Sequence, residues 1–167
     1  MSPRPLAVRI VEELTRRGER LAVAESLTGG LLTSSIVDVP GASAVLLGGV
    51  VAYASPVKAS VLGVDAQLIA EHGVIDAEVA RQMARGAADR LSVAGRAAEY
   101  ALATTGVAGP DPQDGHPAGT VWIGLATPAG ERAQQLALSG DRPAIRAAAV
   151  DAALILLAEE LGLGARE

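Results

Sequence analysis

Residues 20–30 of the sequence, RLAVAESLTGG, decide the fold, because an apolar run ends there in polar residues and a glycine pair. The run RLAVAES predicts a short buried β-strand over 20–26. Thr28-Gly29-Gly30 breaks that strand, and LLTSSIVDV then predicts a helix over 31–39. Ligands of open α/β sheets bind beyond the carboxyl ends of the strands. We therefore expect a binding site where this strand meets this helix.

The elements expected on either side alternate between helices and strands. They are a helix over 4–17, a strand over 48–54, a helical turn over 56–61, a short helix after Asp65, a helix over 76–94, a strand over 100–105, a hairpin of 120–127 and 132–138, and a last helix from Asp141 to 161. This order predicts an α/β fold, a three-layer α/β/α sandwich on a mixed, mostly parallel sheet with one antiparallel hairpin. We expect a single domain over 1–167, since two would leave each half thin.

The composition excludes several classes of function. Half of the residues are apolar, 20% are charged and the net charge is -5, so disorder and a nucleic-acid footprint are both disfavoured. The absence of cysteine removes disulfides, iron–sulfur clusters and thiol nucleophiles. We find no signal peptide and no transmembrane run, and expect a cytoplasmic protein without nucleic-acid or membrane partners. An alanine-rich, apolar surface favours a homodimer.

The first candidate for chemistry is Ser26 at the strand-to-helix junction. We expect its hydroxyl to face a ligand held by free backbone amides of Gly29, Gly30 and Leu31, which would suit an anion or an oxyanion. The same pattern also suits a plain helix cap by Ser26 or Thr28, with the glycines making a tight turn.

The second candidate is the pair Tyr53 and Lys58, five residues apart across a strand end. Thirteen of the fourteen basic residues are arginines, and Lys58 is the one lysine. Of the two basic side chains, only the lysine amine can lose its proton at accessible pH, whereas the arginine guanidinium cannot. A lysine in a partly dry pocket can therefore act as a general base. An edge aromatic beside a surface lysine is the other interpretation. Short-chain dehydrogenases also use Ser, Tyr and Lys, but three residues separate their tyrosine from their lysine. Here four residues separate Tyr53 from Lys58, and no glycine-rich dinucleotide-binding loop follows the first strand, so we exclude that class.

Three further segments give weaker signals. Thr105-Gly106, at a strand end, suits either close backbone approach to a ligand or a plain turn. Arg142 and Arg146 lie one helical turn apart, where they suit either a phosphate grip or solvated helix positions. The loop residues Asp111, Asp114 and His116 are more typical of a hydrophilic loop than of a metal site, and we expect no metal.

Taken in order, the segments AESLTGG, PGAS, GGVVAYASPVKASVLGV, EHGVID, TTGVAGP, AGTVWIGLAT and SGDR resemble the CinA C-terminal domain, the competence/damage-inducible protein family. The resemblance runs from about residue 5 to 162. Members of this family occur alone, as nicotinamide-nucleotide amidohydrolases (NMN deamidases), or behind a larger N-terminal domain. At 167 residues we expect the stand-alone form.

The resemblance implies hydrolysis of the carboxamide of nicotinamide mononucleotide to nicotinate mononucleotide and ammonia, without a cofactor. The residues that it implies are catalytic Ser26, Tyr53 and Lys58, with Thr28, Gly29, Gly30, Ser43, Thr105, Gly106, Arg142 and Arg146 in substrate binding. The segment DPQDGHPAGTV departs from the family's usual Gly-Gly pair and lysine, which bears on rate or specificity. The alternative function is a non-catalytic nucleotide-binding or regulatory module linked to competence or DNA damage.

Overall fold

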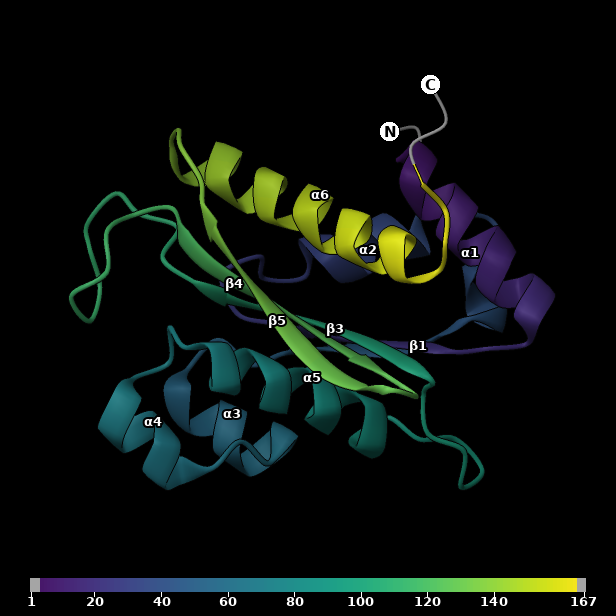
Figure 1. The fold of residues 1–167 in the computed structure, drawn as a ribbon, viewed down its shortest axis with the longest axis horizontal. Helices are drawn as coiled ribbons and strands as arrows, with labels where there is room; N and C mark the ends of the chain where they lie inside the picture. The colour runs from purple at the N-terminus through teal and green to yellow at the C-terminus, as the bar shows by residue number, and fades with distance from the viewer. Residues whose placement is uncertain (1–3, 165–167) are drawn as a thin grey trace.

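The computed structural model describes residues 4–164, which form a five-stranded sheet with helices on both faces (Figure 1). The elements are α1 (Pro5–Arg17), β1 (Leu21–Glu25), α2 (Leu31–Val37), the 3-10 helix η1 (Ala42–Ala44), β2 (Leu46–Val51), α3 (Ser55–Leu62), α4 (Ala66–His72), α5 (Ala77–Arg90), β3 (Tyr100–Gly106), β4 (Thr120–Thr127), β5 (Gly130–Ala137) and α6 (Arg142–Glu160). No helix in this part of the chain is long and apolar enough to cross a membrane.

The strand order is β2-β1-β3-β4-β5. Strand β1 runs parallel to β2 and β3, whereas β4 runs antiparallel to β3 and to β5. Four strands therefore point one way and only β4 points the other way. This arrangement confirms the predicted three-layer α/β fold on a mixed, mostly parallel sheet, with β4–β5 as its hairpin.

Several predicted boundaries were wrong. Strand β2 covers Leu46–Val51 rather than 48–54, because it pairs with β1 from Leu21 opposite Leu46 to Glu25 opposite Val51. Helix α5 ends at Arg90 rather than at residue 94, since a turn closed by Val93 and Arg96 follows it. Helix α2 ends at Val37, and the helical turn expected over 56–61 is a full helix, α3.

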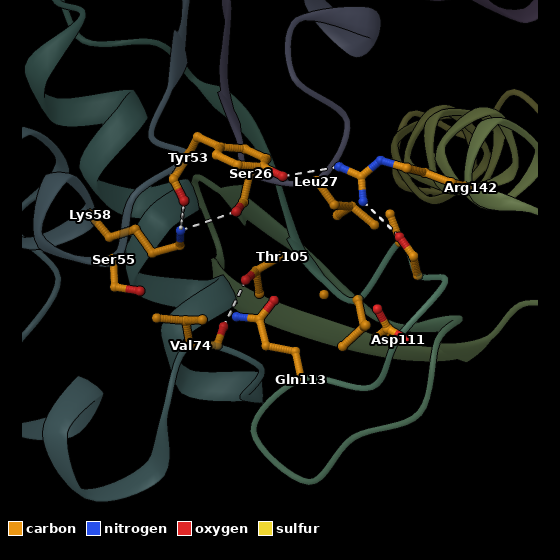
Figure 2. Close-up of a pocket in the computed structure, with 14 residues that line it drawn as sticks. Ser26, Leu27, Tyr53, Ser55, Lys58, Val74, Thr105, Asp111, Gln113 and Arg142 are labelled. Atoms are coloured by element: carbon orange, nitrogen blue, oxygen red, sulfur yellow. Dashed lines mark hydrogen bonds between the residues drawn. The ribbon is translucent and has the colours of Figure 1, made fainter.

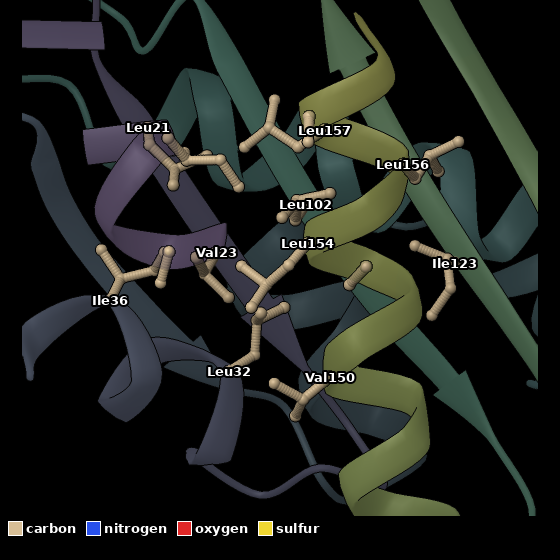
Figure 3. Packing of buried hydrophobic residues seen from close by; sticks show 14 of the residues in the cluster. Leu21, Val23, Leu32, Ile36, Leu102, Ile123, Val150, Leu154, Leu156 and Leu157 are labelled. Atoms are coloured by element: carbon tan, nitrogen blue, oxygen red, sulfur yellow. The ribbon is translucent and has the colours of Figure 1, made fainter. Parts of the chain in front are cut away.

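The two faces of the sheet carry side chains of different size. Leu21 and Val23 of β1 and Leu102 of β3 pack against α1, α2 and α6, as Figure 3 shows. The alternate residues of β1 and β3, which are alanines, face α3 and α5 on the other side. Because side chains alternate along a strand, this division follows directly from the sequence LAVA of β1.

The face of small side chains lets α5 approach the sheet closely. A Cβ atom on Gly124 of β4 would overlap the carbonyl oxygen of Ala80 in α5. A Cβ atom on Gly86 would likewise overlap the carbonyl oxygen of Leu62 at the end of α3. Helix α3 is therefore held against α5, and it carries Lys58 into the fold at the carboxyl end of β1.

Candidate active site

Ser26 follows the last residue of β1, the strand that lies between β2 and β3. Its backbone N–H donates to the carbonyl oxygen of Thr104 in β3 at 2.9 Å, which is the last ladder bond before the chain turns away. The residue is buried. Its side chain points into an open pocket, where Lys58, Thr105 and Tyr53 surround it (Figure 2).

Lys58 lies in the first half of α3 and has no exposed surface. Its Nζ atom lies 3.0 Å from Ser26 Oγ and 3.4 Å from the carbonyl oxygen of Tyr53 (Figure 2). It also lies 2.8 Å from the carbonyl oxygen of Ala52. The helix begins just after the end of β2, with Pro56 in its first turn, so the amine reaches back to the chain that precedes it. The structure therefore brings together the one lysine and the serine of the strand-to-helix junction.

The electrostatic environment of this amine favours its neutral form. Burial lowers the pKa of Lys58 from its ordinary 10.5 to about 8, because desolvation penalises the charged ammonium. Within residues 4–164 no carboxylate forms an ion pair with Lys58 that would oppose this effect. A useful fraction of the amine is thus neutral near physiological pH.

Tyr53 and Arg142 close the opposite side of the pocket. The Tyr53 side chain is 59% exposed, and its hydroxyl accepts a hydrogen bond from Arg142 Nη2 at 3.0 Å (Figure 2). Arg142 Nη1 also donates to the carbonyl oxygen of Gly109, at 2.8 Å. The guanidinium therefore lines the pocket beside the tyrosine, at the start of α6. The Thr105 hydroxyl, in contrast, donates to the carbonyl oxygen of Val74 at 2.7 Å, which ties β3 to the segment before α5.

The expectation of free amides at the head of α2 was wrong. The carboxylate of Glu25, which is completely buried, accepts from the backbone N–H groups of Gly30, Leu32 and Thr33 at 2.8–3.0 Å. The Thr33 hydroxyl adds a fourth hydrogen bond, at 2.6 Å.

The other two amides that were expected to be free, those of Gly29 and Leu31, are also engaged. Gly29 N–H donates to the carbonyl oxygen of Ser26 and Leu31 N–H donates to that of Thr28. A ligand therefore finds no free donor at Gly29, Gly30 or Leu31, because backbone carbonyl oxygens take up the first and the last of these amides and the Glu25 carboxylate takes up the second.

Three other expected binding residues, Thr28, Ser43 and Arg146, also lie outside the pocket lining. Thr28 is buried and its hydroxyl pairs with that of Thr104 at 2.7 Å. Arg146 donates from Nε to the carbonyl oxygen of Leu27 and from Nη2 to that of Thr28, at 2.9 and 2.8 Å. Arg146 therefore braces the turn that carries Ser26, beside Gly29.

Ser43 lies in η1, which precedes β2. Because β1 and β2 are parallel, Ser43 is at the amino end of the sheet and Ser26 at the carboxyl end. The structure thus does not bring Ser43 to Ser26 within one chain.

Four polar residues of the site were given no site role from the sequence: Glu25, Ser55, Asp111 and Gln113. Glu25 had a signal, since it is the only charge between Leu21 and Val37 and falls on the same face of β1 as Leu21 and Val23. Asp111 and Gln113 of the loop after β3 line the pocket, and only the folded loop places them there. Among residues 4–164 no group of three side chains is arranged to hold a metal ion.

These features define a class of protein. It is an α/β protein with a buried serine–lysine pair at the carboxyl end of β1, the strand that lies between two parallel neighbours. The family model of the CinA C-terminal domain matches residues 3–161. The chain belongs to this family.

Named relatives agree with this assignment. The chain is 53% identical over 144 residues to a CinA-like protein of Frankia casuarinae, covering 86% of this chain and 32% of that protein. It is 45% identical over 159 residues to a putative competence-damage inducible protein of Limosilactobacillus reuteri, covering 93% and 37%. The chain thus spans about a third of the length of these curated relatives.

Solved structures match over nearly their whole length. The competence/damage inducible protein CihA from Agrobacterium tumefaciens has a TM-score of 0.86 at 33% identity, with 94% of this chain and 93% of that chain covered. A CinA superfamily protein from Klebsiella pneumoniae has a TM-score of 0.86 at 35% identity, with 95% and 97% covered.

Proposed function

We propose that this domain hydrolyses the carboxamide of nicotinamide mononucleotide, giving nicotinate mononucleotide and ammonia, with Ser26 as nucleophile and Lys58 as general base. The observation that carries the proposal is the 3.0 Å distance between Lys58 Nζ and Ser26 Oγ at the wall of a pocket. A base in hydrogen-bond contact with a hydroxyl is the arrangement that activates serine for attack on an acyl carbon. The resemblance to nicotinamide-nucleotide amidohydrolases supplies the substrate.

The hydrogen bonds of Lys58 suit a neutral amine. A neutral amine has two N–H donors and one lone pair, and its two donors match the carbonyl oxygens of Ala52 and Tyr53. The lone pair then accepts the hydrogen bond of the Ser26 hydroxyl. With a pKa of about 8, roughly a tenth of the amine is neutral at pH 7. This neutral fraction costs about tenfold in rate at pH 7, which is less than the roughly 10²–10⁴-fold rate gain from a general base already in place.

The reaction then proceeds through an acyl-enzyme. Ser26 Oγ forms a bond to the carboxamide carbon while its proton passes to Lys58 Nζ. The protonated amine returns that proton to the departing nitrogen, the C–N bond breaks and ammonia leaves. Water, deprotonated by neutral Lys58, cleaves the ester and restores Ser26. The Tyr53 hydroxyl bonds Arg142 rather than Lys58, so in this scheme Tyr53 orients Arg142 and the amine delivers its proton directly.

The charges of the pocket suit a nucleotide of this kind. Arg142 offers a guanidinium for the phosphate, and Asp111 offers a carboxylate on the same pocket wall. Nicotinamide mononucleotide carries a negative phosphate and a positive pyridinium ring, so both charges of the substrate find a partner of opposite sign.

Release of ammonia from nicotinamide mononucleotide by the purified protein tests the proposal. We expect turnover by the wild type and by Ser92→Ala, an exposed control, and no turnover by Ser26→Ala. Calorimetry of the Ser26→Ala variant should still detect binding of the nucleotide, because only a hydroxyl is lost. Binding without turnover by the wild type would instead identify a non-catalytic nucleotide-binding module.

A further inference from the structure

The donor that stabilises the oxyanion must lie elsewhere, because Glu25 and the turn itself occupy the amides at the head of α2. A backbone N–H aimed at the reacting carbonyl oxygen is the usual source of such stabilisation. Within residues 4–164, the N–H groups of Leu27 and Gly106 both lie beside Ser26, line the pocket and have no acceptor, and Gly106 is the one on the neighbouring strand β3.

The ladder between β1 and β3 leaves one such group at its end. Ser26 N–H donates to the carbonyl oxygen of Thr104, and the next donor along that edge of β3 is Gly106 N–H. In a continuing parallel ladder the partner of Gly106 N–H would be the carbonyl oxygen of Ser26. That oxygen instead accepts from Gly29 N–H at 3.1 Å, because the chain has turned into α2.

No other strand takes up the Gly106 donor. On the β4 side, Gly106 lies opposite Val121 and the ladder bond comes from its neighbour, since Val107 N–H donates to the carbonyl oxygen of Thr120 at 2.9 Å. Hydrogen bonds alternate along an antiparallel pair, so Gly106 N–H faces β1. Within residues 4–164 it has no acceptor, and it lines the pocket that contains Ser26.

The position of Gly106 relative to Lys58 fits this role. The amine approaches Ser26 from the β2 side, where it bonds the carbonyl oxygen of Ala52, whereas Gly106 belongs to β3 on the other side of β1. A base and an oxyanion donor must contact different atoms of the tetrahedral centre. Glycine is also required here, because a Cβ atom on Gly106 would overlap the carbonyl oxygen of Thr120.

We propose that the backbone N–H of Gly106 is the oxyanion donor for acyl transfer at Ser26. When Ser26 Oγ bonds to the carboxamide carbon, the π-electron pair moves to the carbonyl oxygen and Gly106 N–H hydrogen-bonds that negative oxygen. Collapse restores the C=O bond as ammonia leaves with the proton from Lys58. This inference rests on the proposed function, since it needs Ser26 as nucleophile.

Amide-selective NMR of the full chain tests the proposal without changing Gly106. The dipeptide Thr–Gly occurs only at Thr28–Gly29 and Thr105–Gly106. Cell-free synthesis with carbonyl-¹³C threonine and ¹⁵N glycine therefore gives two signals in a carbonyl-filtered amide spectrum. They report on the rejected site at the helix head and on the proposed donor. The Thr28→Ser variant lacks the Gly29 signal and so assigns both.

The probe is an alkyl fluorophosphonate, which phosphonylates a reactive serine with loss of fluoride and leaves a phosphoryl oxygen in the oxyanion position. We expect the Gly106 proton to move downfield and its exchange with solvent to slow, while the Gly29 signal keeps its shift and exchange rate. An unchanged Gly106 signal in the adduct, or equal changes in both signals, overturns the proposal.

Mass spectrometry separates this outcome from a failure of the proposed function. We expect one phosphonyl group on the wild type, located at Ser26 by peptide mapping, and none on Ser26→Ala. A wild type that stays unmodified contradicts Ser26 as nucleophile, and with it this role for Gly106. A modified Ser26 with an unmoved Gly106 signal leaves the nucleophile intact and overturns the donor alone.

Discussion

Lys58 Nζ lies 3.0 Å from Ser26 Oγ with both residues buried, and within residues 4–164 the amine has no carboxylate beside it. A lysine in this position has lost the hydration that normally keeps it protonated and has gained two neutral carbonyl acceptors in exchange. The pair therefore combines a nucleophile with a base of pKa about 8, without histidine.

The base role predicts that Lys58→Arg is nearly as inactive as Lys58→Ala, although arginine keeps the charge. A guanidinium has a pKa above ~12 and cannot accept the Ser26 proton. Ammonia release measures both variants, and thermal unfolding checks that each one folds. The wild-type rate should rise with pH through about 8, because the deprotonated amine is the active form. Substantial turnover by the arginine variant would rule out Lys58 as the base.

The two arginines of α6 should respond differently to substitution. Arg142→Ala removes a guanidinium from the pocket, so KM should rise about 10- to 150-fold with little change in the unfolding temperature. Arg146→Ala removes the brace on Leu27 and Thr28, so the free energy of unfolding should fall by about 1–3 kcal/mol and kcat should fall with it. Steady-state kinetics and urea denaturation separate the two effects. If Arg146→Ala raises KM and leaves the free energy of unfolding unchanged, Arg146 binds the phosphate rather than bracing the turn.

Replacing Glu25 should damage both stability and catalysis. A glutamine offers one acceptor oxygen where the carboxylate accepts four hydrogen bonds, so buried N–H groups of α2 lose their partners. We expect Glu25→Gln to lower the free energy of unfolding by about 1.5–3 kcal/mol and to lower kcat, since the neighbouring Ser26 loses its fixed backbone. Glu12→Gln, at an exposed position of α1, is the matched control. Wild-type stability in Glu25→Gln would mean that the helix head does not depend on this carboxylate.

The carboxylate of Asp111 should contribute to the choice of ring. For Asp111→Asn we expect KM for nicotinamide mononucleotide to rise roughly 2- to 5-fold, the range of an exposed charge pair. The reduced nucleotide has an uncharged ring, and its binding should not change. Asp114→Asn, in the same loop but outside the pocket lining, serves as control. An equal effect on both nucleotides would argue against a contact with the charged ring.

Much of this site follows from local sequence, and the rest depends on contacts that sequence does not show. The strand–turn–helix at Ser26 is visible in the run LAVAESLTGG, and the solitary Lys58 is visible by count alone. The start of β2 is less visible, because Gly48-Gly49 weakens the strand pattern and its pairing with β1 sets the boundary.

The occupancy of the amides at the head of α2 is likewise not visible in the sequence. These amides look free in the sequence, and only the direction of the Glu25 side chain, fixed by its face of β1, shows that they are occupied. The unpaired N–H of Gly106 depends likewise on where the β1–β3 ladder stops. The expected homodimer stays a prediction, which light scattering of the purified protein checks.

The buried amine should also leave a signature in the pH dependence of stability. The pKa of Lys58 is about 8 in the folded state and 10.5 as its ordinary value, so between these values the unfolded chain binds a proton that the folded chain does not. Stability then rises with pH, since the unfolded state is the one that must lose the proton. Relative to Lys58→Met, which has no titrating group, the wild type should gain about 2–3 kcal/mol between pH 7 and pH 10. Urea denaturation of both proteins at the two pH values measures this difference. Parallel pH profiles would mean that Lys58 keeps an ordinary pKa in the folded protein, and the neutral base would lose its physical basis.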